Sequence, residues 1–181
     1  MHVMLDLETL GTRPGCKILS ISAVTFGSNR RFYFDVFVKI DSQPLLVTDE
    51  DTYNWWHTND PELVKFTLHN DHAVPLAQAL YMFSEWYKAL PGEPTIWGNG
   101  ATFDPPVLRA AYEYLGIETP WNFRKERCFR TFKEEVAKPL GVEAPKFCGE
   151  PHRGLHDATF QADWAQAVMD KIKAISDSLK V

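Results

Sequence analysis

Two carboxylates interrupt an otherwise apolar stretch near the N-terminus, Met4-Leu5-Asp6-Leu7-Glu8-Thr9-Leu10-Gly11, and this stretch decides the fold. Side chains alternate between the two faces of a β-strand, so Asp6 and Glu8 point the same way. A carboxylate in a buried strand is costly unless it is paired or bound to a metal. Because the stretch contains no basic residue, it predicts a cation from elsewhere, and Mg²⁺ binds such carboxylates together with water and phosphate oxygens. The alternative is an edge strand whose charges face water.

A second stretch, near the C-terminus, combines histidine with aspartate: His152-Arg153-Gly154-Leu155-His156-Asp157-Ala158. We expect the two stretches to meet in space. His152 and His156 have the spacing of a zinc pair on a helix, but the metalloprotease pattern needs Glu after the first His, where this chain has Arg153. Gly154 also weakens a helix at this point. A structural role for either histidine is the alternative.

The composition is that of a soluble globular protein, with 45% hydrophobic and 24% charged residues, and the length of 181 residues predicts a single domain, 1–181. Three cysteines without a Cys-x-x-Cys pair argue against a disulfide framework or a structural zinc site and favour a reducing cytoplasm. No apolar run reaches the ~18 residues of a membrane span, and Asp6 interrupts any signal peptide. A net charge of −5 gives no overall attraction for nucleic acid, so a nuclease would need metal ions and clustered basic residues.

Strand and helix patterns along the chain predict an α/β fold with a mixed central sheet flanked by helices. Three β-rich segments joined by short turns indicate an antiparallel meander at residues 2–9, 17–26 and 31–40, whereas 41–59 is less regular. Helices are expected at 61–70, with Asp60 as N-cap, and at 76–90, 104–115 and 157–179; short strands are expected at 95–98 and 127–129. The inner face of the last helix would carry Phe160, Trp164, Ala167, Val168, Ile172, Ile175 and Leu179.

Two further carboxylates, Asp104 and Asp157, each stand at the start of a predicted helix. Aspartate is among the best helix N-caps, so capping is the alternative to a chemical role for both. A cap bond uses carboxylate lone pairs, and the two roles therefore compete.

A basic cluster stands out in this acidic chain, and aromatic residues accompany it. Its members are Arg124, Lys125, Arg127, Arg130 and Lys133. They could contact phosphates, or they could form a solvated face paired with Glu134 and Glu135. The aromatic side chains Trp55, Trp56 and Phe103 could stack on bases, but we expect at least one of the two tryptophans to fill the core.

Three motifs in this order resemble those of the DEDDh exonucleases: Asp6-Leu7-Glu8, Phe103-Asp104 ahead of a helix, and His152-x-x-x-x-Asp157-Ala158. This DnaQ-like 3′→5′ family has an RNase H-like fold, and the resemblance covers nearly the whole chain. The sister DEDDy branch has Tyr where this chain has Arg153. The Trp55-Trp56 pair and the loop Trp97-Gly98-Asn99-Gly100 are most similar to small phage and prophage exonucleases related to phage DexA and the exonuclease VIII group.

The resemblance implies roles for the matching positions. His152 would be the general base, and two divalent ions, Mg²⁺ or Mn²⁺, would be held by Asp6, Glu8, Asp104 and Asp157. Contacts to the substrate, from the resemblance and from the basic and aromatic clusters, are expected at Thr9, Leu10, Gly11, Trp55, Phe103, Arg127 and Arg130. The commoner DnaQ pattern has Asn where this chain has Gly100, which leaves any role of Asn99 open.

The sequence therefore predicts a metal-dependent exonuclease that removes nucleotides from the 3′ ends of single-stranded DNA or RNA. Two metals ~3.5–4 Å apart activate the water and stabilise the leaving oxygen, and a histidine can take the water's proton at neutral pH. One alternative is a non-catalytic nucleic-acid-binding module, which would gain nothing from four clustered acids. Another is an RNase H-like endonuclease, which the His-x-x-x-x-Asp element disfavours. The location is expected to be cytoplasmic without a membrane partner, and the oligomeric state, a homodimer included, stays open.

Overall fold

A five-stranded mixed sheet forms the centre of the computed structural model, which describes residues 1–59 and 61–180. Its order is β3-β2-β1-β4-β5, with bounds β1 His2–Thr9, β2 Ile18–Phe26, β3 Tyr33–Phe37, β4 Thr95–Gly98 and β5 Glu126–Cys128. The first three strands pair antiparallel, whereas β1–β4 and β4–β5 pair parallel. The predicted meander and mixed sheet are thus confirmed, although β3 is shorter than expected.

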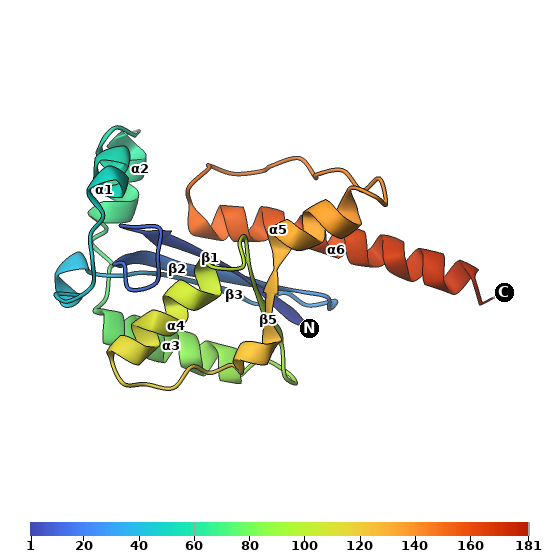
Figure 1. Cartoon of the computed structure of the whole chain (residues 1–181), viewed down its shortest axis with the longest axis horizontal. Coiled ribbons are helices and arrows are strands. Elements are labelled where there is room, and N and C mark those ends of the chain that lie inside the picture. Colours follow the sequence, from blue (N-terminus) through green and yellow to red (C-terminus); the bar gives the residue numbers. More distant parts are fainter. Residues whose placement is uncertain (60, 181) are drawn as a thin grey trace.

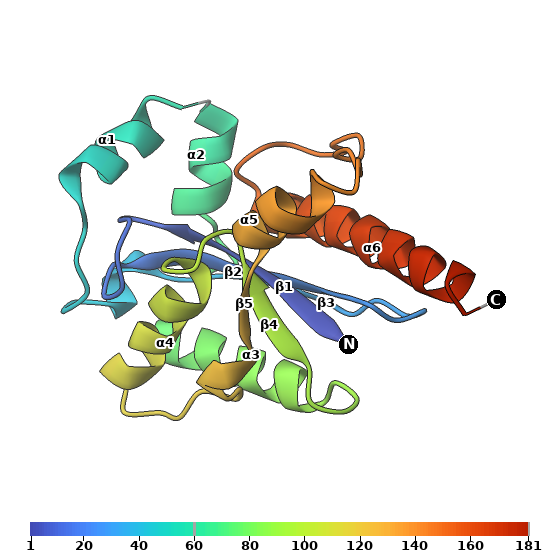
Figure 2. The ribbon, with the colours of Figure 1, turned by 45° about the vertical axis from the view of Figure 1, so that its right-hand side comes forward.

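Helices cover both faces of this sheet (Figures 1 and 2). Their bounds are α1 Glu50–His57, α2 Pro61–Leu68, α3 Leu76–Lys88, α4 Asp104–Tyr114, α5 Phe129–Phe132 and α6 Gly154–Ser178. Short 3₁₀ turns occur at Ile40–Ser42 and Phe123–Lys125, and a π-helical turn, Lys133–Ala137, follows α5. In Figure 2, α3 and α4 lie on one side of the sheet, α5 and α6 lie on the other, and α1 and α2 stand together at one end.

The central strand β1 shows why the fold places two carboxylates under α6. Val3, Leu5 and Leu7 are buried in the core with α3 and α4, while Met4 is buried in a second core with α6. Alternation along the strand then puts Asp6 and Glu8 on the α6 side. Both faces of β1 are covered, so the edge-strand alternative does not hold.

Two segments differ from the sequence expectation. The stretch 41–59 contains α1, whose N-cap Asp49 accepts a hydrogen bond from the Thr52 backbone N–H at 2.9 Å. Helix α6 begins at Gly154 instead of residue 157, so Asp157 lies within its first turn and is not its N-cap. The predicted N-cap Asp60 lies outside the described residues.

The C-terminal end of α6 extends past the sheet (Figure 1). Its apolar residues Ile172, Ile175 and Leu179 are 41%, 38% and 81% exposed, so their predicted place on a buried inner face is wrong. Helical periodicity continues beyond the point where the sheet offers a surface to cover. Within the described part of the chain, no helix has both the length and the apolar character needed to cross a membrane. The three cysteines are free, as predicted.

Candidate active site

Three carboxylates from two distant parts of the chain meet beneath the start of α6. Oxygens of Asp6 and Glu8, from β1, and of Asp157, from α6, all lie within 4.8 Å of one another. They border a cleft of about 300 Å³ lined by Asp6, Leu7, Glu8, Asn99, Phe103, Asp104, Arg130, His152, Asp157 and Gln161. The predicted meeting of the N-terminal and C-terminal stretches is therefore confirmed.

The fourth carboxylate, Asp104, is 2% exposed and lies beside this cluster. Its Oδ1 accepts a hydrogen bond from the Leu7 N–H at 3.1 Å, and its Oδ2 accepts one from the Asn99 N–H at 2.9 Å. Asp104 is the first residue of α4 and is not its N-cap, which is Phe103. A Cβ at Gly98 would lie 2.7 Å from Asp104 Oδ2, so glycine at the end of β4 lets this carboxylate approach. The side chain thus joins β1 to the loop after β4 instead of capping its own helix.

The carboxylate cluster is electrostatically unfavourable without a cation. Burial, followed by the charges of Asp104, Glu8 and Asp157, raises the pKa of Asp6 well above its ordinary value. Burial and the charges of Asp157 and Asp104 raise the pKa of Glu8 to about 9. The pKa of Asp104 rises to about 6 because of burial, which its backbone N–H donors partly offset. Burial also raises the pKa of Asp157, against the effect of the His152 backbone and imidazole. A divalent cation would remove this mutual repulsion, and the oxygen-only donor set suits Mg²⁺ or Mn²⁺.

The two histidines of the second stretch occupy different places. His152 lies on the turn before α6, with a left-handed φ of 61° that is unusual for a residue other than glycine, and it lines the cleft. His156 lies inside α6, and its Nδ1 accepts a hydrogen bond from the Glu150 backbone N–H at 3.0 Å. The predicted hydrogen bonding of His156 at the helix entry is confirmed, and His152 is the histidine that borders the cleft.

The adjacent tryptophans of α1 also separate. Trp55 is 41% exposed, and its ring lies 4.9 Å from the His152 ring in an edge-on arrangement. Trp56 is 1% exposed, and its Nε1 donates a hydrogen bond to the Thr9 carbonyl at 2.9 Å. One tryptophan therefore fills the core, as predicted, and anchors α1 to the end of β1. The other lies against His152, which lines the cleft.

The residues that follow Glu8 are closed to solvent in this structure. Thr9, Leu10 and Gly11 are all buried, and Leu10 is 1% exposed within a core cluster that includes Trp56. The Thr9 hydroxyl donates to the Gly11 carbonyl at 2.6 Å. The structure thus brings this segment next to the cleft but leaves its side chains no open surface for a nucleotide.

The basic cluster divides between the cleft and the surface. Arg130 lines the cleft, and its Nη2 donates a hydrogen bond to the Asn99 carbonyl at 2.8 Å. Arg127 does not line it, and its Nη1 donates to the backbone carbonyls of Arg124 and Glu126. Lys125 pairs with Glu93 at 3.1 Å. Arg130 is therefore the member of the cluster placed to contact a phosphate in the cleft.

Gln161 is a cleft residue that the sequence analysis did not identify. It is 5% exposed, and its Nε2 donates a hydrogen bond to Asp6 Oδ1 at 2.9 Å. Its signal in the sequence is its position four residues after Asp157, one turn along the same face of a helix.

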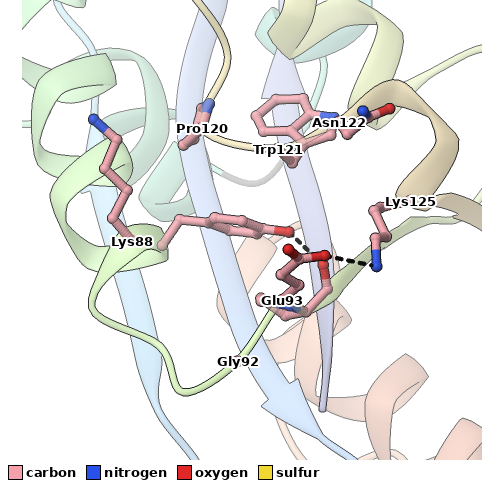
Figure 3. A pocket seen from close by; sticks show the side chains of 9 residues that line it. Lys88, Gly92, Glu93, Pro120, Trp121, Asn122 and Lys125 are labelled. Atoms are coloured by element: carbon pink, nitrogen blue, oxygen red, sulfur yellow. Dashed lines mark hydrogen bonds and ion pairs between the residues drawn. The ribbon is translucent and has the colours of Figure 1, made fainter.

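A second cavity, of about 320 Å³, lies apart from the carboxylates (Figure 3). Its lining includes Lys88, Trp121, Asn122 and Lys125, and Glu93 pairs with Lys125 across it (Figure 3). Its lining shares no residue with the cleft and contains no cluster of acidic groups.

Comparison with known proteins gives one family match by sequence and several matches by structure. The family model described as the 3′-5′ exoribonuclease Rv2179c-like domain matches residues 1–169. A search of curated proteins by sequence found no significant match.

Three solved structures illustrate the similarity in fold. Exonuclease X in complex with 5′ overhanging duplex DNA has a TM-score of 0.58 and 16% identity, over 94% of this chain and 92% of that one. The nuclease domain of 3′hExo, described as a DEDDh family member bound to rAMP, has a TM-score of 0.56 and 16% identity, over 93% of this chain and 90% of that one. The Mg²⁺- and Mn²⁺-bound form of Pop2p from S. pombe has a TM-score of 0.56 and 14% identity, over 91% of this chain and 81% of that one. At such identities the matches show a shared fold, the DEDDh or RNase H-like α/β fold that the sequence predicted.

Proposed function

The chain belongs to the Rv2179c-like 3′-5′ exoribonuclease domain family and is a 3′→5′ exonuclease, and from this premise we propose that its substrate is single-stranded RNA. In this proposal Asp6, Glu8, Asp104 and Asp157 hold two divalent cations, and His152 is the general base. The observation that carries it is the convergence of Asp6, Glu8 and Asp157 within 4.8 Å of one another, beside His152, in one cleft.

The cation site rests on the chemistry of its donors. The three oxygens of Asp6, Glu8 and Asp157 are close enough to share one ion. In its absence burial raises the pKa of all three carboxyls, and the neighbouring carboxylates raise the pKa of Asp6 and of Glu8 further. The adjacent Asp104 would share a second ion through the lone pairs that remain on its two oxygens, each of which accepts one backbone hydrogen bond. When bound, such ions supply positive charge for the scissile phosphate and for the leaving oxygen.

The proton transfer is assigned to His152. This imidazole lies at the edge of the cleft, on the turn that precedes α6, and it takes the proton of the attacking water as the phosphodiester bond breaks. Its strained backbone and the edge-on Trp55 ring fix its position between the carboxylates and solvent. His156 points into a hydrogen bond with the Glu150 backbone and takes no part in the reaction.

The choice of a single strand follows from what borders the cleft. Phe103 lines the cleft, the half-exposed Trp55 lies beside His152, and both rings offer aromatic surfaces on which unpaired bases can stack. Arg130 offers one cation for the backbone. The preference for RNA over DNA follows the activity for which the family is named. Among the described residues that line the cleft, Arg130 is the one arginine or lysine, and the chain has a net charge of −5, so binding should be weak with a shallow salt dependence.

The test uses 5′-labelled RNA and DNA oligonucleotides of one sequence, with Mg²⁺, with Mn²⁺ or with EDTA. We expect a ladder that shortens from the 3′ end, faster on RNA, and no cleavage in EDTA. Cleavage of a circular RNA would show an endonuclease instead. RNA binding without any cleavage under all conditions would favour the non-catalytic binding module.

The Asp104→Ala variant tests the fourth carboxylate in the same assay. We expect near-complete loss of turnover and, in a Mn²⁺ titration, loss of one of two bound ions. Full activity would show that Asp104 only ties β1 to the loop after β4.

A further inference from the structure

The carboxylate of Asp6 depends on a single side chain for its orientation. Among residues 1–59 and 61–180, the amide Nε2 of Gln161 is the group that donates a hydrogen bond to it, at 2.9 Å. The neighbouring Asp104 is held differently, by the backbone N–H groups of Leu7 and Asn99. A β-strand fixes the position of the Asp6 Cβ, but rotation about χ2, the torsion that turns the carboxylate, is only weakly restricted. Asp6 therefore needs a partner to keep one oxygen directed at Glu8 and Asp157.

The orientation of the Gln161 amide is fixed by chemistry. A cation binds the ionised form of Asp6, and if the amide were turned round, its oxygen would face that carboxylate and two acceptors would be in contact. With the nitrogen on Asp6, the oxygen Oε1 is buried and has no hydrogen-bond partner among the described residues. Gln161 is 5% exposed and lines the cleft, so this acceptor is an unsatisfied group at the edge of the carboxylate cluster. Unsatisfied buried acceptors of this kind commonly mark a site where water or a ligand completes the hydrogen bonding.

We propose that Gln161 is a positioning residue, which fixes the Asp6 carboxylate for cation binding through Nε2 and accepts a hydrogen bond through Oε1 from water that enters with the cation. The inference rests on the proposed function of the cleft, and it adds a residue to which no catalytic role has been given. Its physical basis is general, because mutating a group that orients a metal ligand typically costs about 10–100-fold in metal affinity or activity.

The test replaces Gln161 with methionine, which has a similar length and no hydrogen-bond donor. We expect Gln161→Met to weaken Mn²⁺ binding, measured by calorimetry on the metal-free protein, by about 10–100-fold. In the RNase assay at saturating Mn²⁺, kcat should fall while KM for RNA stays within about twofold, because the residue acts on the carboxylate and not on the nucleotide.

The matched control is the same substitution on the same helix. Gln166 accepts a hydrogen bond from the Gly27 N–H at 2.6 Å and donates to Asp170, and it lies outside the cleft. Gln166→Met should keep the wild-type Mn²⁺ affinity. If Gln161→Met does not fold, Gln161→Asn serves instead, because its amide is polar but too short to reach Asp6. It should lose Mn²⁺ affinity by at least about tenfold, the lower end of the range for such groups.

Two results separate this inference from the proposed function. A folded Gln161→Met or Gln161→Asn variant with wild-type Mn²⁺ affinity and kcat would overturn the positioning role. If the wild type fails to shorten RNA but loses Mn²⁺ affinity on Gln161→Met, the positioning role stands and the proposed substrate is wrong.

Discussion

Replacing Gly154 with alanine should disturb the active site through packing alone. Gly154 is the first residue of α6 and lies directly over β2, where an added Cβ would sit 2.6 Å from Ser22 Oγ and 3.1 Å from Ser22 Cβ. The same Cβ would lie 3.4 Å from the backbone oxygen of Asp6. Ser22 cannot turn aside freely, because its hydroxyl donates a hydrogen bond to Asp35 at 2.7 Å. The start of α6, which carries Asp157, must therefore move away from the sheet.

The expected size of the effect follows from these contacts. Overpacking of a close contact costs about 1–3 kcal/mol, and the better helix propensity of alanine offsets up to about 1 kcal/mol. A net loss of about 1–2 kcal/mol in the free energy of unfolding corresponds to a fall in Tm of about 2–8 °C for a chain of this size. Because Asp157 moves with the helix, Mn²⁺ affinity should fall as well.

The assay is thermal unfolding with and without Mn²⁺ on a double-mutant cycle. Ser22→Ala alone should cost about 1 kcal/mol for its lost hydrogen bond. In the Gly154→Ala/Ser22→Ala double variant the contact at 2.6 Å is gone, so the free energy of unfolding should fall by less than the sum of the falls in the two single variants. A Gly154→Ala variant with wild-type Tm and Mn²⁺ affinity would refute the reasoning, and so would strict additivity in the cycle.

Three other predictions follow from the site. Because the folded protein raises the pKa of Glu8 to about 9, it binds this proton more tightly than the unfolded chain does, so the metal-free protein should lose stability as the pH rises from about 5 to 9. Thermal unfolding in EDTA checks this, Glu8→Gln should flatten the dependence, and a Tm that rises across this window would contradict it. His152→Ala should lower kcat by about 10²–10⁴-fold and leave Mn²⁺ binding intact. His156→Ala should keep most of the rate and lose about 1 kcal/mol in the free energy of unfolding. If kcat falls in His156→Ala and not in His152→Ala, the general base is His156. Arg130→Ala should raise KM for RNA, and reduce the salt dependence of that KM, more than Arg127→Ala does, because Arg130 lines the cleft. Equal effects of the two substitutions would show that the phosphate contact lies on the surface outside the cleft.

The sequence by itself determined the elements whose signal is local. The alternation along β1 placed Asp6 and Glu8 on one face, and the β-rich segments with short turns gave the antiparallel meander, because both patterns depend only on neighbouring residues. The loop position of His152 also followed from the sequence. The resemblance in the order of the three motifs supplied the rest of the proposed catalytic set, since no local pattern distinguishes a metal-binding aspartate from a helix cap.

The tertiary structure decided everything that depends on how elements approach one another. Glycine appears unfavourable in a helix, yet α6 begins at Gly154 because the close contact with Ser22 leaves no room for a side chain. The hydrogen bond from Gln161 to Asp6 joins residues 155 positions apart, and no sequence pattern predicts such a pair. The end of α6 keeps its apolar periodicity where no sheet remains to cover it, so the pattern predicts a helix correctly but not its burial. Periodicity reports which face of an element is apolar, whereas packing alone decides what that face meets.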